Sequence, residues 1–349
     1  MKRVGLVLVA LLMLGTASNA SNTWVGGASG DWSNPANWST ATQPSSSETA
    51  VINNAVVTAD VPAAFGQLIL SNVANSNATL LVNNPSVTLV IAKSSTEDVS
   101  GAYADPAIGT LDLRAGSVRV YNTSGTNGEY RLSHSYTATC QGTIKLSGVG
   151  ILDLDVLSKG DKAAVNSTFV GTGGTLIIRN QINKFGLVSG GYSGFHLGSS
   201  LLAPGGIGTV GAQIGVGLSQ NTDFFADTGT LEFDIASATS YDQIKGRGTC
   251  DLTDGAALSV QFLAGYTPAA QASWDLWVPY DANSSGAGIP TLRVPTGYNA
   301  GDFSLAWLDM VSDPNGWADT LRLTYVPEPA ALVMLVGGLG WLLIRRKAA

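Results

Sequence analysis

The chain has 349 residues, and its low charge and high glycine content already narrow the choice of fold. Charged residues make up 12% of the chain and hydrophobic residues 45%, with 18 basic against 25 acidic side chains. This composition excludes an intrinsically disordered chain, which is poor in hydrophobic residues, and a coiled coil, which is rich in charged helix formers. The 42 glycines and 13 prolines instead favour a folded chain with many turns, as in β-structure.

The N-terminus, residues 1–20, has the pattern of a secretory signal peptide. Lys2 and Arg3 precede an apolar segment, residues 4–14, which is followed by small residues up to Ala20. We therefore expect a signal helix that signal peptidase cleaves between Ala20 and Ser21. An uncleaved anchor is the alternative, but the apolar segment is shorter than the about 20 residues that span a bilayer.

The C-terminus carries a second targeting pattern. Residues 327–329 read Pro-Glu-Pro, and an apolar segment covers residues 330–344. The basic cluster that ends the chain consists of Arg345, Arg346 and Lys347. A transmembrane helix over residues 330–344 would be about 22 Å long, which is short for the bilayer core of about 30 Å. Its basic end would stay in the cytoplasm, so the rest of the chain would lie outside.

This three-part tail resembles the PEP-CTERM sorting signal of Gram-negative bacteria. The resemblance rests on Pro327, Glu328 and Pro329, followed in order by the hydrophobic segment and the basic cluster. It implies recognition by an exosortase-type sorting enzyme, a transient stay in the inner membrane, and cleavage near the Pro-Glu-Pro box. It also implies delivery to the cell envelope or the extracellular matrix, where such proteins are often associated with exopolysaccharide and biofilm. A plain single-span tail anchor is the alternative.

Between the two signals, residues 21–326 form one extracytoplasmic body in which short segments alternate between apolar and polar residues. Each segment is bounded by Gly, Asn, Ser or Asp, as expected for strands that end in turns. The clearest segments are residues 110–114, 117–121, 143–147, 151–156, 174–179, 229–235, 257–262 and 320–324. We therefore predict an all-β body, with helices only in the two terminal signals.

A recurring phrase at the start of strands bears on the architecture. Gly-Thr-Leu or Gly-Thr-Ile begins at Gly109, Gly142, Gly174 and Gly229, so the phrase recurs at irregular intervals. A repeated turn-and-strand phrase is typical of stacked coils, each of which buries its apolar face against its neighbours. We predict a right-handed parallel β-helix-like solenoid, with a β-sandwich as the alternative.

Residues 200–265 carry a second resemblance. They contain, in order, the segments Leu-x-Pro-Gly, Gly-Thr-Leu-Glu-Phe-Asp-Ile, Tyr-Asp-Gln-Ile and Asp-Gly-x-x-Leu-x-Val. This order is similar to the passenger-type β-helix segments of autotransporters and of many PEP-CTERM proteins. The resemblance implies an extracellular passenger or surface role, and it carries over no catalytic residue.

Three tryptophans, Trp24, Trp32 and Trp38, lie at the start of the body in a phrase that looks like the opening of secreted bacterial β-helix proteins. One interpretation is a cap over the open end of the solenoid, in which Asn37 holds a turn. The other is a carbohydrate contact site, because an exposed indole offers an apolar face and an N–H group to a sugar.

The candidates for catalysis are few. His134 and His196 have no acidic neighbour in the sequence. Two acidic pairs, in each of which one residue separates the two carboxylates, would share one face of a strand and could act on a polysaccharide. The pairs are Asp153 with Asp155 and Glu232 with Asp234. Simple alternation of polar and apolar residues in a half-exposed strand explains both pairs better, so we expect no enzyme, no catalytic residue, no metal site and no cofactor.

The two cysteines, Cys140 and Cys250, distinguish the two architectures. After the expected export of the body, both cysteines would be in an oxidising compartment, where disulfides form. Coils of about 20 to 25 residues would place them four or five coils apart, about 20 Å, which is beyond the Cα limit of about 7 Å for a disulfide. A sandwich could bring them together, so the redox state of this pair tests the fold.

These observations predict an exported, envelope- or matrix-targeted structural or adhesive surface protein. The expected partners are signal peptidase, an exosortase-type enzyme and exopolysaccharide. The alternative is an extracellular β-helix protein that acts on polysaccharide or binds carbohydrate. Nucleic acid is not an expected partner, because the body has 13 basic and 24 acidic residues, a net formal charge of −11, and repels polyanions.

Overall fold

The computed structural model describes most of the body and neither of the two apolar terminal segments. The described residues are 20–93, 99–102, 106–122, 128–133, 140–159, 167–183, 185, 194–218, 222–263, 265–280, 284–309 and 319–327. Within them the regular structure is strand, apart from two single-turn 3-10 helices, Pro35–Asn37 and Ala300–Asp302. In this part of the chain no helix is long and apolar enough to cross a membrane. The predicted helices over residues 4–14 and 330–344 lie outside it.

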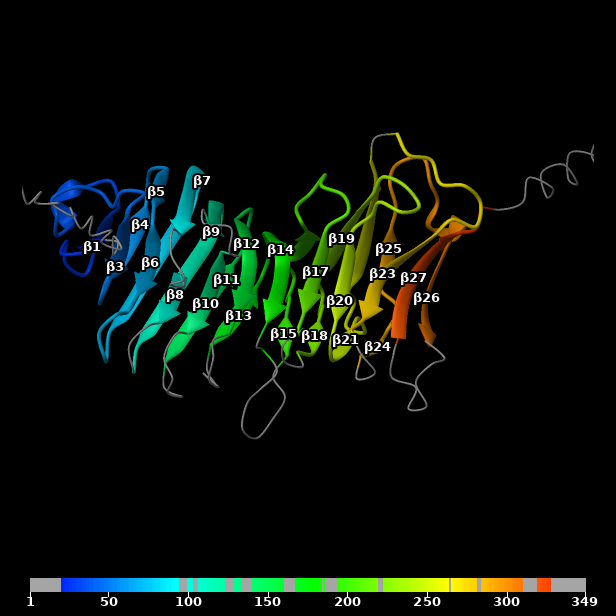
Figure 1. Ribbon diagram of the computed structural model, residues 1–349. Coiled ribbons are helices and arrows are strands. Elements are labelled where there is room, and N and C mark those ends of the chain that lie inside the picture. Colours follow the sequence, from blue (N-terminus) through cyan, green and yellow to red (C-terminus); the bar gives the residue numbers. More distant parts are fainter. Residues whose placement is uncertain are drawn as a thin grey trace, which may run out of the picture.

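The strands stack in three parallel ladders along an elongated body, with β1 at one end and β26 and β27 at the other (Figure 1). The first ladder contains β1 (Ala20–Thr23), β3 (Glu48–Ile52), β6 (Gln67–Leu70), β8 (Val99–Ala102), β10 (Glu129–Ser133), the ends of β12 (Ile151–Ser158) and β14 (Thr175–Asn183), β17 (Gln213–Val216), β20 (Gln243–Gly246) and β23 (Ser273–Pro279). At about 4.8 Å between neighbouring strands, the nine steps from β1 to β23 cover about 43 Å.

The other two ladders follow the same order along the body. The second contains β2 (Ser29–Asp31), β4 (Val56–Ala59), the first halves of β7 (Asn77–Lys93) and β9 (Ile108–Asn122), β11 (Gln141–Leu146) and β13 (Thr168–Gly171). It is continued by a smaller parallel sheet of β15 (Phe195–His196), β18 (Phe224–Phe225), β21 (Thr249–Asp251) and β24 (Ser285–Ala287). The third contains β5 (Ala63–Phe65), the second halves of β7 and β9, the first halves of β12 and β14, then β16 (Leu201–Pro204), β19 (Thr230–Ile235), β22 (Ala257–Phe262) and β25 (Thr291–Arg293).

This parallel pairing accounts for the alternation seen in the sequence. In β11, for example, Ile144 and Leu146 are buried while Lys145 between them is exposed. Ile144 lies beside Leu111 of the preceding coil and Phe169 of the next. Inward-facing residues therefore stack on one another from coil to coil, and their burial drives each new coil onto the last. The prediction of an all-β body is confirmed, and its long parallel ladders differ from the antiparallel sheets of a sandwich.

The Gly-Thr phrases are in register, but they belong to two ladders. Gly109 lies beside Gly142 in the second ladder, one coil apart. Thr175 and Thr230 lie in the third ladder on either side of Leu201, two coils apart. The first interval, from Gly109 to Gly142, is therefore one coil. The second, from Gly142 to Gly174, moves from the second ladder to the third, and the last, from Gly174 to Gly229, covers two coils.

The C-terminal end of the body is closed by antiparallel strands. β27 (Asp319–Tyr325) pairs with β23 on one side and with β26 (Phe303–Asp309) on the other. Aromatic rings gather beneath them, with Phe303 5.0 Å from Tyr325 and Phe262 5.0 Å from Tyr298 between ring centroids. These rings cover apolar surface that a further coil would otherwise bury.

The two cysteines are far apart, as a stacked-coil body predicts. Neither forms a disulfide, and both are buried. Cys140 directly precedes β11 and Cys250 lies in β21. Between them, β13, β15 and β18 follow one another along the second ladder and the smaller sheet that continues it. Four strand spacings of about 4.8 Å separate them by about 19 Å, well beyond disulfide reach.

Candidate functional site

The first acidic pair is held by arginines from neighbouring coils. The carboxylate of Asp153, in β12, accepts two hydrogen bonds from Arg179 of the next coil, at 2.8 Å from Nε and 2.9 Å from Nη2. Arg119 of the preceding coil approaches the same carboxylate at 3.5 Å. Asp155 accepts a hydrogen bond from the backbone N–H of Gly128 at 2.8 Å. These contacts make the pair an ionic tie between coils, and they do not favour the general acid and base of a glycosidase.

The second acidic pair belongs to a larger cluster that the sequence did not predict. Glu232 and Asp234 lie on β19 with one residue between them, and the connection that follows this strand brings Asp242 against them. Asp242 accepts hydrogen bonds from the backbone N–H groups of Asp234, at 3.1 Å, and Ala212, at 3.0 Å. Asp234 accepts one from Gly208 at 2.6 Å. Two side chains of β19, the side chain of Asp242 and backbone N–H groups of the connection that contains Gly208 and Ala212 therefore meet at this point.

Burial and mutual repulsion favour the protonated forms of these carboxyl groups. Asp242 and Asp234 are only 1% and 2% exposed. Burial, together with the negative charges of Asp234 and Glu232, raises the pKa of Asp242 to about 7. Burial also raises the pKa values of Glu232 and Asp234, and for Glu232 the charge of Asp234 adds to the effect. Loss of water disfavours the charged form of a carboxyl group, and a second carboxylate nearby acts in the same direction.

Metal binding has no support in the described part of the chain. No group of three or more His, Cys, Asp or Glu side chains there is arranged to hold a metal ion. Both oxygens of Asp242 already accept backbone hydrogen bonds. The arrangement suits a proton better than a cation that needs several free oxygens.

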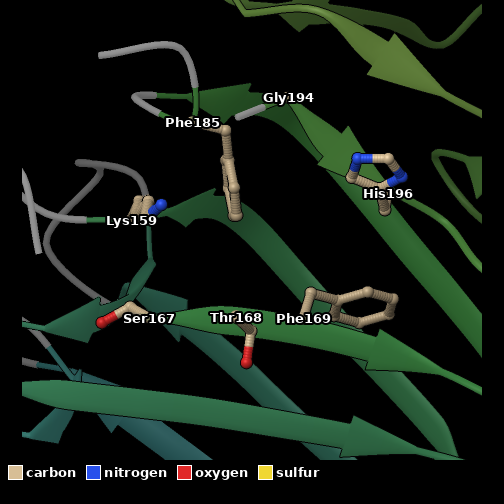
Figure 2. Close-up of a pocket in the computed structure, with 7 residues that line it drawn as sticks. All are labelled: Lys159, Ser167, Thr168, Phe169, Phe185, Gly194 and His196. Carbon is tan, nitrogen blue, oxygen red and sulfur yellow. The ribbon is translucent and has the colours of Figure 1, made fainter. Parts of the chain in front are cut away.

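A small pocket lies on the side of the body that carries β13 and β15 (Figure 2). Its lining residues are Lys159, Ser167, Thr168, Phe169, Phe185, Gly194 and His196. Its volume of about 130 Å³ is below the roughly 300 Å³ of typical small-molecule sites. Figure 2 shows Lys159 and Ser167 on one side of Phe185 and His196 on the other. These polar groups do not converge on one point, as a catalytic centre requires.

His196 has an acidic partner that its sequence neighbours did not reveal. Its Nδ1 lies 3.1 Å from Oδ1 of Asp227, and its ring stacks on Phe225 with centroids 4.5 Å apart. Asp227 lies 31 residues after His196 in the sequence and one coil further along the body. The length of one coil is therefore the sequence signal that could have predicted this pair. His134 lies outside the described residues.

The three tryptophans pack together in the interior, which favours the cap over the carbohydrate contact. Trp24, Trp32 and Trp38 are 5%, 0% and 2% exposed. The rings of Trp32 and Trp38 meet edge to face with centroids 4.7 Å apart, and Trp32 also packs on Phe65. None of the three offers an exposed indole face to a sugar, because each covers the apolar interior of the first coils. Asn37 donates to the backbone carbonyl of Asp31 at 3.1 Å, as expected for a residue that holds the turn.

The predicted processing residues lie at the two ends of the described chain. Ala20 and Ser21 are exposed and belong to β1, which pairs with β3. Pro327 lies two residues after the end of β27 and is the last described residue. The rest of the predicted sorting signal, Glu328 to Lys347, lies outside the described residues. A comparison of the chain with protein-family models and with curated proteins found no match.

Proposed function

We propose that this protein is an exported structural or adhesive surface protein, sorted to the cell envelope or matrix by its C-terminal tail. One observation carries the proposal: the stack of parallel coils runs from β1 to the antiparallel strands β26 and β27 with an apolar interior. The charged side chains best placed for chemistry are tied to other coils or to backbone N–H groups. Such a body is suited to act as a rigid spacer or contact surface.

The proposal includes a right-handed parallel β-helix for residues 21–326. Parallel strands joined by crossover connections are right-handed in nearly all known cases, and the three ladders have this connectivity. The predicted signals would extend from opposite ends of the body, because β1 and β27 lie at its two ends (Figure 1). The processing partners proposed are signal peptidase and an exosortase-type enzyme, and the proposed destination is rich in exopolysaccharide.

The test is the fate of the body when its tail is changed. Deletion of residues 327–349 should move the body from the envelope fraction to the periplasm or the medium, measured by fractionation and immunoblotting. Replacement of Arg345, Arg346 and Lys347 by alanine should leave an uncleaved precursor of higher mass, while Lys245→Ala in the body serves as a control for loss of a basic residue. Unchanged localisation after the deletion would exclude the sorting role.

A further inference from the structure

The connection between β16 and β17, residues 205–212, is fastened to the body by carboxyl groups. Gly208 donates its backbone N–H to Asp234, and Ala212 donates its own to Asp242. Asp242 also accepts the N–H of Asp234. The two carboxyl groups therefore join the 205–212 connection to β19 and to the connection between β19 and β20, residues 236–242.

Two oxygen atoms of this cluster are buried without a hydrogen-bond partner. They are Oδ1 of Asp234 and Oε1 of Glu232. A buried carboxylate oxygen that has lost its water without gaining a donor costs free energy, and the cost is greater when another carboxylate is close. A protonated carboxyl group within the cluster would supply a hydrogen-bond donor to such an oxygen.

The arginines around the cluster contact other groups or lie on a strand that does not pair with β19. Arg179 binds Asp153 and the carbonyl oxygen of Gly205. Arg322 binds Asp275 at 2.6 Å. Arg293 lies on β25, two strands from Glu232, with Ser259 between them.

The remaining elements around the cluster add little charge. The 205–212 connection has no titratable side chain, and β22 faces the cluster with Ser259 and Gln261. Tyr241 is the titratable neighbour in the 236–242 connection, and Lys245 is the charged residue of β20. A proton on one of the three carboxyl groups would lower the negative charge of the cluster and add a hydrogen-bond donor.

We propose that Glu232, Asp234 and Asp242 form a proton-dependent clasp, which holds the 205–212 connection on the body while it is protonated and releases it when it ionises. The direction follows from linkage between protonation and conformation. In the closed state Asp242 keeps its proton up to about pH 7, whereas a solvated aspartate loses it near pH 4. Closure is therefore favoured at low pH, and it weakens as the pH rises through the pKa of Asp242 in the closed state.

Hydrogen exchange of the full chain, followed by mass spectrometry, measures this directly. After correction for intrinsic exchange rates, protection of residues 205–212 should fall about tenfold between pH 6 and pH 8.5. The 172–174 connection is the internal control, because Thr172 and Gly174 are held by backbone carbonyls alone. Its protection should not change with pH.

Two substitutions distinguish pH-dependent release of the 205–212 connection from a loss of protection that does not depend on pH. Asp242→Asn cannot ionise at this position and should weaken the pH dependence of the 205–212 connection, even if its overall protection is lower. Asp254→Asn, at an exposed turn before β22, should keep the wild-type profile. A flat wild-type profile, or a variant of Asp242 that still follows the wild-type profile, overturns the proposal. Restoration of protection at pH 8.5 by millimolar calcium but not by calcium with EDTA would also overturn it, in favour of a cation site.

Discussion

At the scale of single residues, carboxylates add side-chain links between coils to the backbone ladders and the apolar interior. Asp153 joins two arginines from neighbouring coils, and Asp155, Asp227, Asp234 and Asp242 each accept a backbone N–H group about one coil away or closer. Partly exposed ion pairs such as those of Asp153 contribute about 1 kcal/mol or less each. Those contacts whose partners lie on different coils help to fix the register of the coils.

Asp242 should make the stability of the whole chain depend on pH. Its pKa is raised, so the folded state holds a proton that the unfolded state releases, and the resulting stabilisation is complete below pH 4 and lost as the pH rises through about 7. A rise from pH 5 to pH 8 should therefore lower the free energy of unfolding by about 2 kcal/mol through this residue.

The measurement is urea unfolding of the wild type and of Asp242→Asn at both pH values. The difference between the two proteins isolates this group, because all other titrating residues are shared. A difference that stays constant with pH would show that Asp242 is already ionised at pH 5.

At the scale of elements, the glycines of the repeated phrase allow close contact between backbones. A Cβ atom at Gly142 would lie 1.4 Å from the carbonyl oxygen of Leu132. The Gly-Thr phrase is therefore more than a turn signal: glycine is the residue that fits where β11 passes the end of β10.

Gly142→Ala should destabilise the chain by about 3 kcal/mol or more, because the backbone of β10 must move to admit the new methyl group. Gly301→Ala is the matched control, since nothing lies within 4 Å of the added Cβ there, and it should change stability by about 0.5 kcal/mol or less. Chemical denaturation of both variants checks this. Equal stability of the two variants would mean that β10 and β11 are not in this contact.

At the scale of the whole molecule, the stack of coils keeps the cysteines apart and out of solvent. Both thiols are fully buried, and burial raises the pKa of Cys250 well above its usual range. Because the thiolate is the reactive form, a thiol reagent such as dithionitrobenzoate should label neither cysteine in the native protein.

In denaturant the same reagent should count two thiols per chain, even in protein exported to an oxidising compartment. Purification without reductant followed by labelling in concentrated guanidinium tests this. Recovery of no thiol would mean that the cysteines are paired, and a separation of about 19 Å between their strands does not permit that pairing in this fold.

The sequence predicted the features that depend on local patterns. Period-two alternation identified the strands, because a strand half buried in a stack must alternate. The Gly-Thr phrases indicated stacked coils, and the compositions of residues 1–20 and 327–349 predicted targeting segments, which remain predictions. The long separation of Cys140 and Cys250 followed from the length of a coil.

Only the tertiary structure decided which residues meet across coils. The pairing of Asp153 with Arg179, of His196 with Asp227, and of Asp242 with Asp234 depends on register and on the path of each connection. The burial of Trp32 and its neighbours depends on how the first coil closes. A sequence pattern alone could not distinguish a cap from a carbohydrate contact site. Alternation determines which residues face inward, but stacking determines which side chains become neighbours, and that is where the carboxyl cluster arises.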